Sequence, residues 1–220
     1  MTLRVLTWNL MHGRSVPPAG RDLFDRFAAA LRGWEWDLAL LQEVPPWWPA
    51  GLGAAASAQH RVVLTSRNAL LPLRRTVATR WPDLIKSNGG GSNAILVRGL
   101  AVVEHRVRRL AWLPERRWMH AMLLGNGVWV GNLHAAADPS QGRAAAAALL
   151  RWAAGAPVVL GGDFNMRSLS LEGLSVAGRS GVDQVFAGGG LVAGGSAEVL
   201  DRGSLSDHAP VAVRVMDLAQ

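Results

Sequence analysis

One stretch constrains this chain more than any other: residues 158–165, with the sequence Val-Val-Leu-Gly-Gly-Asp-Phe-Asn. Its three apolar residues, two of them β-branched, predict a buried strand. We expect the two glycines to end that strand, because glycine permits a turn and a close approach of other atoms. Alternate residues of an extended backbone share one side, so Asp163 and Asn165 would point at one spot while Phe164 anchors the tip in the core. The stretch predicts a functional site, with an ordinary turn after a strand as the alternative.

The composition is that of a chain able to form a sizeable hydrophobic core. Half of the 220 residues are hydrophobic and no linker-like tract divides them, so we expect a single domain over residues 1–220. Cysteine and tyrosine are absent, which excludes disulfides, thiolate metal sites and phenol chemistry. No apolar run reaches the ~20 residues of a membrane-spanning helix, and the N-terminal sequence lacks a signal-peptide pattern. These features predict a cytoplasmic protein, and we expect a monomer.

The net charge of +7 comes from 23 basic residues, of which only Lys86 is a lysine. Basic proteins often bind polyanions, so the charge supports a phosphate-bearing substrate. Heavy use of arginine, alanine and glycine with little lysine is also expected from a GC-rich genome.

Apolar runs and their periodicity predict an α/β protein with many strands. We expect helices at 22–33 and 140–154, and strands at 3–9, 37–44, 61–66, 93–98, 101–110, 117–124, 128–134, 158–160, 182–186 and 211–215. Residues 68–86 are predicted to be irregular and 88–92 to form a flexible loop. His105 is expected at the surface, and Trp47 and Trp48 are expected to pack in a loop, although such a pair can also stack on bases or enter lipid.

Eight polar residues share one placement, at or beside the end of an expected apolar strand. They are Asn9, Glu43, Asn132, His134, Asp163, Asn165, Asp207 and His208. Strand ends are where ligands bind in open α/β sheets. If these ends converge, carboxylates, amides and imidazoles form an oxygen-rich set without thiols, which suits Mg²⁺ or Mn²⁺ and metal-assisted phosphoester hydrolysis. Each residue also has an alternative role outside a shared site. Glu43 could form a salt bridge with an arginine, and the other residues could occupy ordinary turns or loops. His12, in the loop after Asn9, is favoured as a surface residue.

Taken in order, these motifs resemble those of the endonuclease/exonuclease/phosphatase superfamily, which has the deoxyribonuclease-I-like fold. The matching segments span nearly the whole chain: Thr7-Trp8-Asn9 with His12-Gly13, Leu41-Gln42-Glu43, 91–98, Gly131-Asn132-Leu133-His134, Gly161-Gly162-Asp163-Phe164-Asn165, 182–186 and Ser206-Asp207-His208-Ala209-Pro210. Leu133 and Gln184 depart from residues common in relatives, but neither removes a chemical group. The resemblance implies a four-layer α/β sandwich, in which two mixed, mainly antiparallel β-sheets pack face to face and are flanked by helices.

The resemblance also implies a Mg²⁺- or Mn²⁺-dependent phosphoesterase that uses in-line attack by an activated water. Glu43 would bind the cation with help from Asn9, and Asp207 would support it or bind a second one. Asp163 would orient or deprotonate the attacking water, and Asn165 would hold the scissile phosphate.

Two histidines complete the implied site. His208 would contact the phosphate and transfer a proton, while Asp183 would accept a hydrogen bond from its imidazole and fix its tautomer. His134 would lie near the leaving group as a general acid, with Asn132 supporting it and binding substrate.

The substrate is open at this stage. Positive charge and the tryptophans near Glu43 favour a nuclease or phosphodiesterase acting on nucleic acid. The alternative is a phospholipid or small phosphoester, with Trp47 and Trp48 making peripheral contact with a membrane. A non-catalytic binding module is less favoured, because every matched position keeps its polar group.

Overall fold

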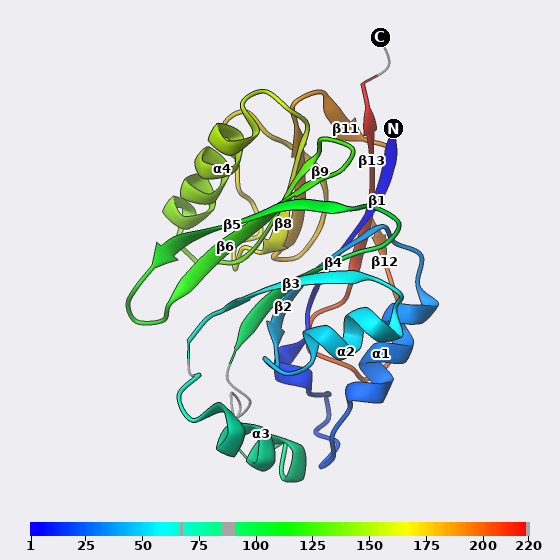
Figure 1. Cartoon of the computed structure of the whole chain (residues 1–220), viewed down its shortest axis with the longest axis vertical. Helices are drawn as coiled ribbons and strands as arrows, with labels where there is room; N and C mark the ends of the chain where they lie inside the picture. Colours follow the sequence, from blue (N-terminus) through cyan, green and yellow to red (C-terminus); the bar gives the residue numbers. More distant parts are fainter. Residues whose placement is uncertain (67, 85–90, 219–220) are drawn as a thin grey trace.

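The computed structural model describes residues 1–66, 68–84 and 91–218. Two β-sheets pack face to face, and helices cover their outer faces (Figure 1). The expected four-layer α/β sandwich is therefore confirmed. The expected loop at 88–92 falls mostly outside the described residues, as does Lys86.

The first sheet has seven strands and is built around the parallel pair β1 (Thr2–Asn9) and β2 (Leu38–Val44). Its order is β11-β13-β1-β2-β4-β3, with β12 paired to β13. The other strands pair antiparallel: β3 (Gln59–Leu64), β4 (Ser92–Val97), β11 (Leu191–Ala193), β12 (Glu198–Val199) and β13 (Val211–Asp217).

The second sheet has six strands and is built around the parallel pair β7 (Trp129–His134) and β8 (Val158–Asp163). Its order is β5-β6-β7-β8-β10-β9. The antiparallel strands are β5 (Val102–Ala111), β6 (Arg117–Leu124), β9 (Ser175–Ser180) and β10 (Asp183–Gly188). The mixed, mainly antiparallel character of both sheets matches the prediction.

The central core lies between the sheets, because alternate side chains of each strand face the opposite sheet. Val5 and Leu40 of the first sheet meet Val130, Val159 and Val185 of the second, and all five are fully buried. Burial of such side chains contributes about 1.5–3 kcal/mol each. The sheets are therefore held at a fixed spacing, which places their strand ends reproducibly.

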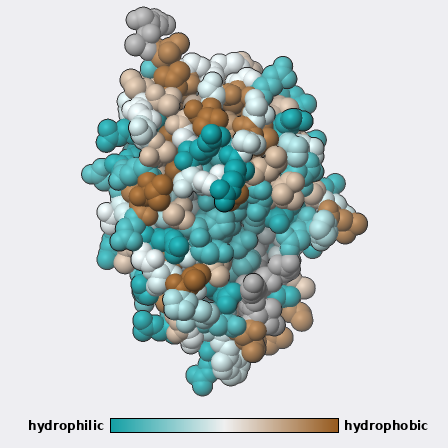
Figure 2. Space-filling model, turned by 180° about the vertical axis from the view of Figure 1, so that it is seen from behind, coloured by the Kyte–Doolittle hydropathy of each residue, from teal (hydrophilic) through white to brown (hydrophobic). Residues whose placement is uncertain are grey.

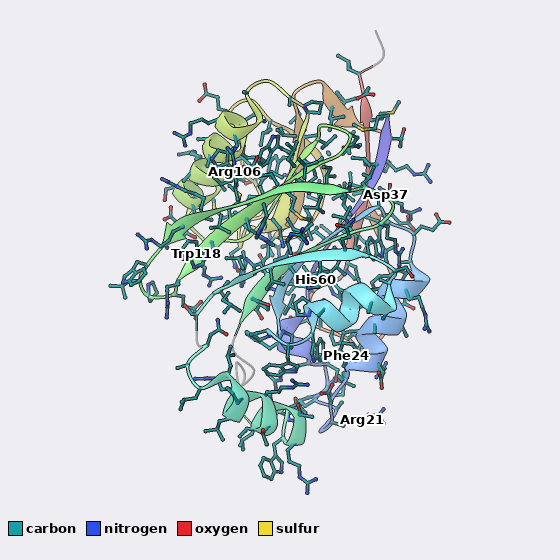
Figure 3. All side chains as sticks on the ribbon, in the orientation of Figure 1. Arg21, Phe24, Asp37, His60, Arg106 and Trp118 are labelled. Atoms are coloured by element: carbon teal, nitrogen blue, oxygen red, sulfur yellow. The ribbon has the colours of Figure 1, made fainter. Side chains whose placement is uncertain are left out.

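Helices α1 (Phe24–Gly33) and α2 (Pro49–Ala55) cover the first sheet, and α4 (Pro139–Ala153) covers the second. Figure 3 shows Phe24 on α1 near α2, and its ring lies 5.5 Å from that of Trp48. Helix α4 begins where the Asp138 side chain accepts a hydrogen bond from Ser140 N, a cap that satisfies a free amide. Helix α3 (Leu71–Arg80) lies at one end of the molecule and has no buried residue (Figure 1).

Strand β8 does not end at its glycines but continues to Asp163, so the expected stop at Gly161 is wrong. Both glycines are instead required by close packing. Gly162 has φ +144°, and a Cβ there would collide with the carbonyl oxygen of Leu133. A Cβ at Gly161 would lie 2.6 Å from a methyl group of Leu40 on the facing sheet.

Several other expectations fail locally. Residues 68–86 are not irregular throughout, since they contain α3, and α2 was not expected either. Each helix has a proline in its first turn, Pro49 in α2 and Pro72 in α3, where proline is tolerated. Strands β9, β11 and β12 lie in a Ser/Gly-rich region with little apolar pattern. His105 is half-buried, with Nε2 3.2 Å from His120 Nδ1, so its expected surface position is wrong. None of the helices in the described ranges is long and apolar enough to cross a membrane.

Candidate active site

The predicted site residues meet at one edge of the sandwich. Strands β1, β2, β7 and β8 end there, which brings together Asn9, Glu43, His134 and Asp163. Strand β10 runs antiparallel to β8 and starts opposite Asp163. The loop that precedes β13 returns to the same edge, because β13 pairs with β1.

This edge also concentrates unusual backbone conformations. Positive φ angles are uncommon outside glycine and cost of order 1–3 kcal/mol, and they cluster at functional sites. Five of the eight described non-glycine residues with positive φ lie here: Met11 (49°), His12 (54°), Glu43 (50°), Asn165 (51°) and Ser206 (60°). At Glu43 the pairing of β2 with β4 is interrupted, which releases this residue from the regular ladder.

Asp163 is the best-held carboxylate of the site. It is 1% exposed, its Oδ2 accepts a 3.0 Å bond from Asn9 Nδ2, and its Oδ1 accepts a 2.9 Å bond from Asn165 N. The second bond is the local turn anticipated after the strand, and Phe164 is buried as expected. Both carboxylate oxygens therefore have fixed directions at the edge of the pocket.

His208 and Asp183 form a hydrogen-bonded pair, with 2.8 Å between Nδ1 and Oδ2. The loop is fixed by Trp8 Nε1, which donates to His208 O at 3.0 Å, and by Ser206 Oγ, which accepts from His208 N at 3.1 Å. Burial opposes protonation of the imidazole, but the hydrogen bond and charge of Asp183, with Asp163 and Asp207, raise the pKa of His208 to about 9. His208 is therefore an imidazolium at neutral pH.

His134 has the opposite protonation state. Its Nε2 lies 3.5 Å from Asp163 Oδ2, and its Nδ1 lies 3.7 Å from Glu43 Oε1. Burial, together with the charges of Arg117, His12 and His208, lowers the pKa of His134 well below its ordinary value. A neutral imidazole is a poor proton donor at neutral pH, so the general-acid role expected for His134 is not supported.

Glu43 points toward solvent-accessible space, with 25% of its side chain exposed. Its ion-pair contacts are imidazoles: His12 Nε2 at 3.2 Å from Oε2, and His134 at the distance given above. Among the described residues Glu43 therefore forms no salt bridge with an arginine, which was the alternative considered for it. His12 is only 16% exposed and contacts Glu43, which differs from the surface position favoured for it.

The donors at this edge fit a divalent cation. Single ligand atoms of Asp163, Asp183 and His208 lie within 4.8 Å of one another, but a protonated His208 cannot bind a cation, so this cluster offers only carboxylate oxygens. Asp183 Oδ1 is buried and lacks a hydrogen-bond partner among the described residues. Burial raises the pKa of the Asp183 carboxyl, because it disfavours the charged form. Carboxylate oxygens without thiols are the ligands that Mg²⁺ and Mn²⁺ prefer. Asp207 lies apart from Glu43: its side chain is 56% exposed and approaches His208 Nε2 at 4.0 Å.

Comparison with known proteins identifies the family. The sequence profile described as the Endonuclease/Exonuclease/phosphatase family matches residues 6–208. The chain belongs to this family. Its members hydrolyse phosphoesters, which agrees with the oxygen-rich site.

Several solved structures share this fold. An endonuclease/exonuclease/phosphatase from Bacteroides vulgatus has a TM-score of 0.72 and 15% identity, covering 99% of this chain and 100% of that chain. TDP2 from Caenorhabditis elegans has a TM-score of 0.69 and 18% identity, covering 98% and 75%. The mannosyl-6-phosphatase Bt3783 of Bacteroides thetaiotaomicron has a TM-score of 0.71 and 16% identity, covering 97% and 99%. No curated protein matches the sequence. At these identities the structures establish a common fold and leave the substrate open.

Asn132 was expected to bind substrate, but it lies away from the pocket in this protein. It is fully buried, and its Nδ2 donates to Leu41 O and Ala94 O, both at 2.9 Å, on the other sheet. Its Oδ1 accepts a 2.8 Å bond from Gln42 Nε2. Asn132 therefore joins the two sheets beneath the site, and contact with substrate is excluded by its burial.

A pocket of about 290 Å³ opens beside Glu43, His134 and Asn165. The matching motifs also contain His12, Gly91 and Asn93 of its lining, although no role was expected for them, and the sequence did not indicate the others, which are Thr65, Ser66, Glu115, Arg116 and Arg117. A second pocket of about 270 Å³ adjoins Asp183, Asp207 and His208. Figure 2 shows that hydrophilic residues gather across the middle of one face of the molecule, with hydrophobic residues scattered around them.

The tryptophans expected near Glu43 do not line this pocket. Trp48 is 4% exposed and packs against Phe27, while Trp47 lies beside Arg75 at the edge of α3. Packing of Trp48 agrees with the favoured alternative for this pair. Stacking on a base or insertion into lipid at the reaction centre is therefore not available to it.

Proposed function

We propose that the protein is a divalent-metal-dependent phosphoester hydrolase, in which an activated water attacks phosphorus in line with the departing oxygen. One observation carries the proposal: the buried Asp163 lies between a protonated imidazole, His208, and a neutral imidazole, His134. A carboxylate base beside a positively charged donor combines acceptance of a proton from water with stabilisation of the negative charge that develops on the phosphoryl group.

Glu43 would hold the cation, and the oxygens of Asp163 and Asn9 would complete the protein ligands. A bound Mg²⁺ or Mn²⁺ would supply positive charge beside the phosphoryl and departing oxygens. Asn9 Oδ1 already accepts from Met11 N at 2.9 Å, and its second lone pair is the one that could face a cation.

Asp163 would orient the water and accept its proton as the water oxygen forms a bond to phosphorus. The phosphorus–ester oxygen bond breaks in the same displacement, and the departing oxygen takes up a proton from solvent to become an alcohol, while Asp163 later returns its proton to solvent. Because Asn9 and Asn165 N already fix both carboxylate oxygens, little reorganisation accompanies the step.

His208 would donate from Nε2 to a phosphoryl oxygen, since its Nδ1 is held by Asp183. An imidazolium placed where negative charge develops stabilises the transition state more than the ground state. Asp183 acts through His208 by fixing the tautomer and keeping the ring charged.

Asn165 Nδ2 would also donate to the phosphoryl group. In the structure this amide donates to Ala135 O at 2.8 Å and lies 3.1 Å from His134 Nε2. An amide has two N–H groups, so the one that faces neutral His134 would turn to the phosphoryl oxygen when substrate binds. His134 would orient the Asn165 amide until then, which gives it a positioning role instead of the acid role.

A nucleic acid is the second, more specific candidate for the substrate. The net charge of +7 favours it, and Arg116 and Arg117 place part of that charge on the wall of the pocket. If plasmid DNA is cleaved, the rate at low substrate should fall steeply between about 50 and 200 mM salt, since polyanion binding releases counterions. A small phosphoester should respond much less.

The reaction class is tested with bis-p-nitrophenyl phosphate and p-nitrophenyl phosphate, each with Mg²⁺, Mn²⁺ or EDTA. We expect release of p-nitrophenol with either cation and none with EDTA, and restored turnover when excess Mn²⁺ follows EDTA. Turnover that persists in EDTA would contradict metal dependence. Absence of turnover from folded protein on both esters, on DNA and on lipid and sugar phosphates would favour a binding module.

A further inference from the structure

The pocket beside Glu43 contains a buried amide with an unused oxygen. Asn93, the second residue of β4, is 1% exposed and lines this pocket. Its Oδ1 has no hydrogen-bond partner among the described residues, and its Nδ2 makes only a long 3.4 Å contact to Trp118 O. Buried polar atoms without partners are rare and costly, so this amide is suited to a donor supplied by a ligand.

One wall of the pocket comes from the start of β6. The Arg117 side chain is 17% exposed, and its Nη2 is held at 2.7 Å from Glu115 Oε2. Arg116 N donates to Ser66 Oγ at 2.6 Å, which ties this wall to the end of β3. Arg117 lines the same pocket as Glu43 and His134, so its charge lies beside the reaction centre.

The floor of the pocket is fixed before any ligand arrives. Thr65 N donates to Gly91 O at 3.0 Å, and Asn68 Nδ2 donates to the carbonyl oxygens of both residues, at 3.0 and 2.9 Å. Gly91 N donates back to Asn68 Oδ1 at 3.1 Å. A preformed floor lowers the entropy that a ligand must lose on binding.

The chemistry of the lining selects among substrates. Apart from Gly91, every lining residue within the described part of the chain is polar or charged, and none of these residues carries a phenyl or indole ring. Recognition of single-stranded nucleic acid relies on aromatic stacking platforms, and recognition of acyl chains relies on apolar walls, and this pocket offers neither. At about 290 Å³ it lies near the lower end of ligand pockets, which start at about 300 Å³.

We propose that this pocket binds the alcohol portion of the substrate, and that this portion is a compact polyhydroxylated group of sugar or polyol size. A hydroxyl would donate to Asn93 Oδ1, and Arg117, together with Arg116 at the rim, would donate to neighbouring hydroxyl oxygens. Thr65 and Ser66 can both donate and accept, so they match hydroxyls in either direction. This inference rests on the proposed phosphoester hydrolysis and specifies its substrate class.

The test compares hydroxylated and plain substrates in Asn93→Leu. Glucose 6-phosphate and glycerol 3-phosphate supply hydroxyls, while p-nitrophenyl phosphate offers an aromatic group without any. We expect Asn93→Leu to lower kcat/KM for the hydroxylated esters by about 5–100-fold, and to change that for p-nitrophenyl phosphate by less than about 3-fold. Asn126→Leu, on the exposed turn between β6 and β7, should change neither.

Arg116→Gln covers the case in which Asn93→Leu does not fold, because Arg116 is exposed on the rim of the pocket. Arg116→Gln should raise the KM for the hydroxylated esters several-fold and leave the KM for p-nitrophenyl phosphate nearly unchanged. Equal losses on all esters, or no loss on any, would overturn the inference. Cleavage of DNA that Asn93→Leu leaves intact, with no turnover of the hydroxylated esters, would also overturn it.

Calorimetry separates this inference from the reaction itself. Glucose 6-phosphate is titrated into Asp163→Asn, with and without Asn93→Leu. Binding that Asn93→Leu weakens at least about 5-fold supports the pocket assignment even if wild-type protein turns nothing over. Turnover of p-nitrophenyl phosphate by wild-type protein, together with calorimetric binding that does not depend on Asn93, rejects the pocket assignment and retains the hydrolase.

Discussion

Replacing Asp183 by asparagine should lower the pKa of His208. The side chain keeps its size and can still accept a hydrogen bond at 2.8 Å from Nδ1, but it loses its negative charge. Burial still disfavours the imidazolium. Only the charges of Asp163 and Asp207, whose oxygens lie 3.8 and 4.0 Å from His208 Nε2, then remain to stabilise it. His208 should therefore change from mostly charged to mostly neutral at pH 8.

The magnitude follows from the pKa itself. A pKa of about 9 exceeds the ordinary 6.5 by about two to three pKa units, and each unit corresponds to 1.36 kcal/mol, so the site favours the imidazolium by roughly 3 kcal/mol. Asp183 supplies most of this preference. We expect Asp183→Asn to lower the pKa of His208 by at least about 2, and to lower kcat by about 10²–10⁴-fold.

The assay is an NMR titration of the imidazole Hε1 resonance of His208 between pH 5 and 10, assigned by its disappearance in His208→Gln. It is run first without divalent cation. Asp207→Asn is the matched control, because Asp207 is exposed and farther away, and it should lower the pKa by less than about 1. Mg²⁺ added to wild-type protein should also lower the pKa, since a nearby cation disfavours the imidazolium. A His208 pKa near 6.5 in wild-type protein, or one that Asp183→Asn leaves unchanged, would refute this reasoning.

Four further outcomes are expected. Gly162→Ala should lower the free energy of unfolding by at least ~3 kcal/mol in urea titrations, because φ is +144° and the added Cβ meets backbone, whereas Gly181→Ala, with φ +61° and open space around it, should cost only ~1 kcal/mol. Glu43→Gln should weaken Mn²⁺ binding at least ~10-fold in calorimetry, and wild-type affinity would remove Glu43 from the cation site. His134→Ala should lower kcat at least ~10²-fold, and an unchanged kcat would remove His134 from the mechanism. The stabilisation from charged His208 should be full below pH 6.5 and lost as pH rises through 9, so the unfolding free energies of wild-type protein and Asp183→Asn should differ more at pH 6 than at pH 10.

The sequence was sufficient to predict the residues that end strands. Asp163, Asn165 and Glu43 each follow an apolar run, and strand alternation together with strand ends places such residues at one edge of a sheet. The pairing of Asp183 with His208 required the family resemblance, because it joins residues 25 positions apart in the sequence. The same apolar runs predicted most strands and helices, because the periodicity of apolar residues is a local property of the sequence.

Features that depend on the contact between sheets could not be predicted. Asn132 stands at a strand end like the others, yet its amide bridges to β2 and β4 and never reaches the pocket. Arg117 and Asn93 line the pocket only because β6 and β4 lie on facing sheets. The low pKa of His134 likewise arises from burial and from charges on several elements, which no local pattern records.

The most direct measurement is turnover of bis-p-nitrophenyl phosphate by wild-type protein and Asp163→Asn across a Mn²⁺ titration, with circular dichroism to verify that both are folded. Asn retains the size of Asp163 but can accept only one of its two hydrogen bonds, so the substitution removes the base, its charge and one contact, and circular dichroism checks that the fold survives. The account predicts saturable, Mn²⁺-dependent turnover in wild-type protein and a kcat lower by at least ~10³-fold in Asp163→Asn. Equal turnover by the two folded proteins would contradict the assignment of the reaction to this site.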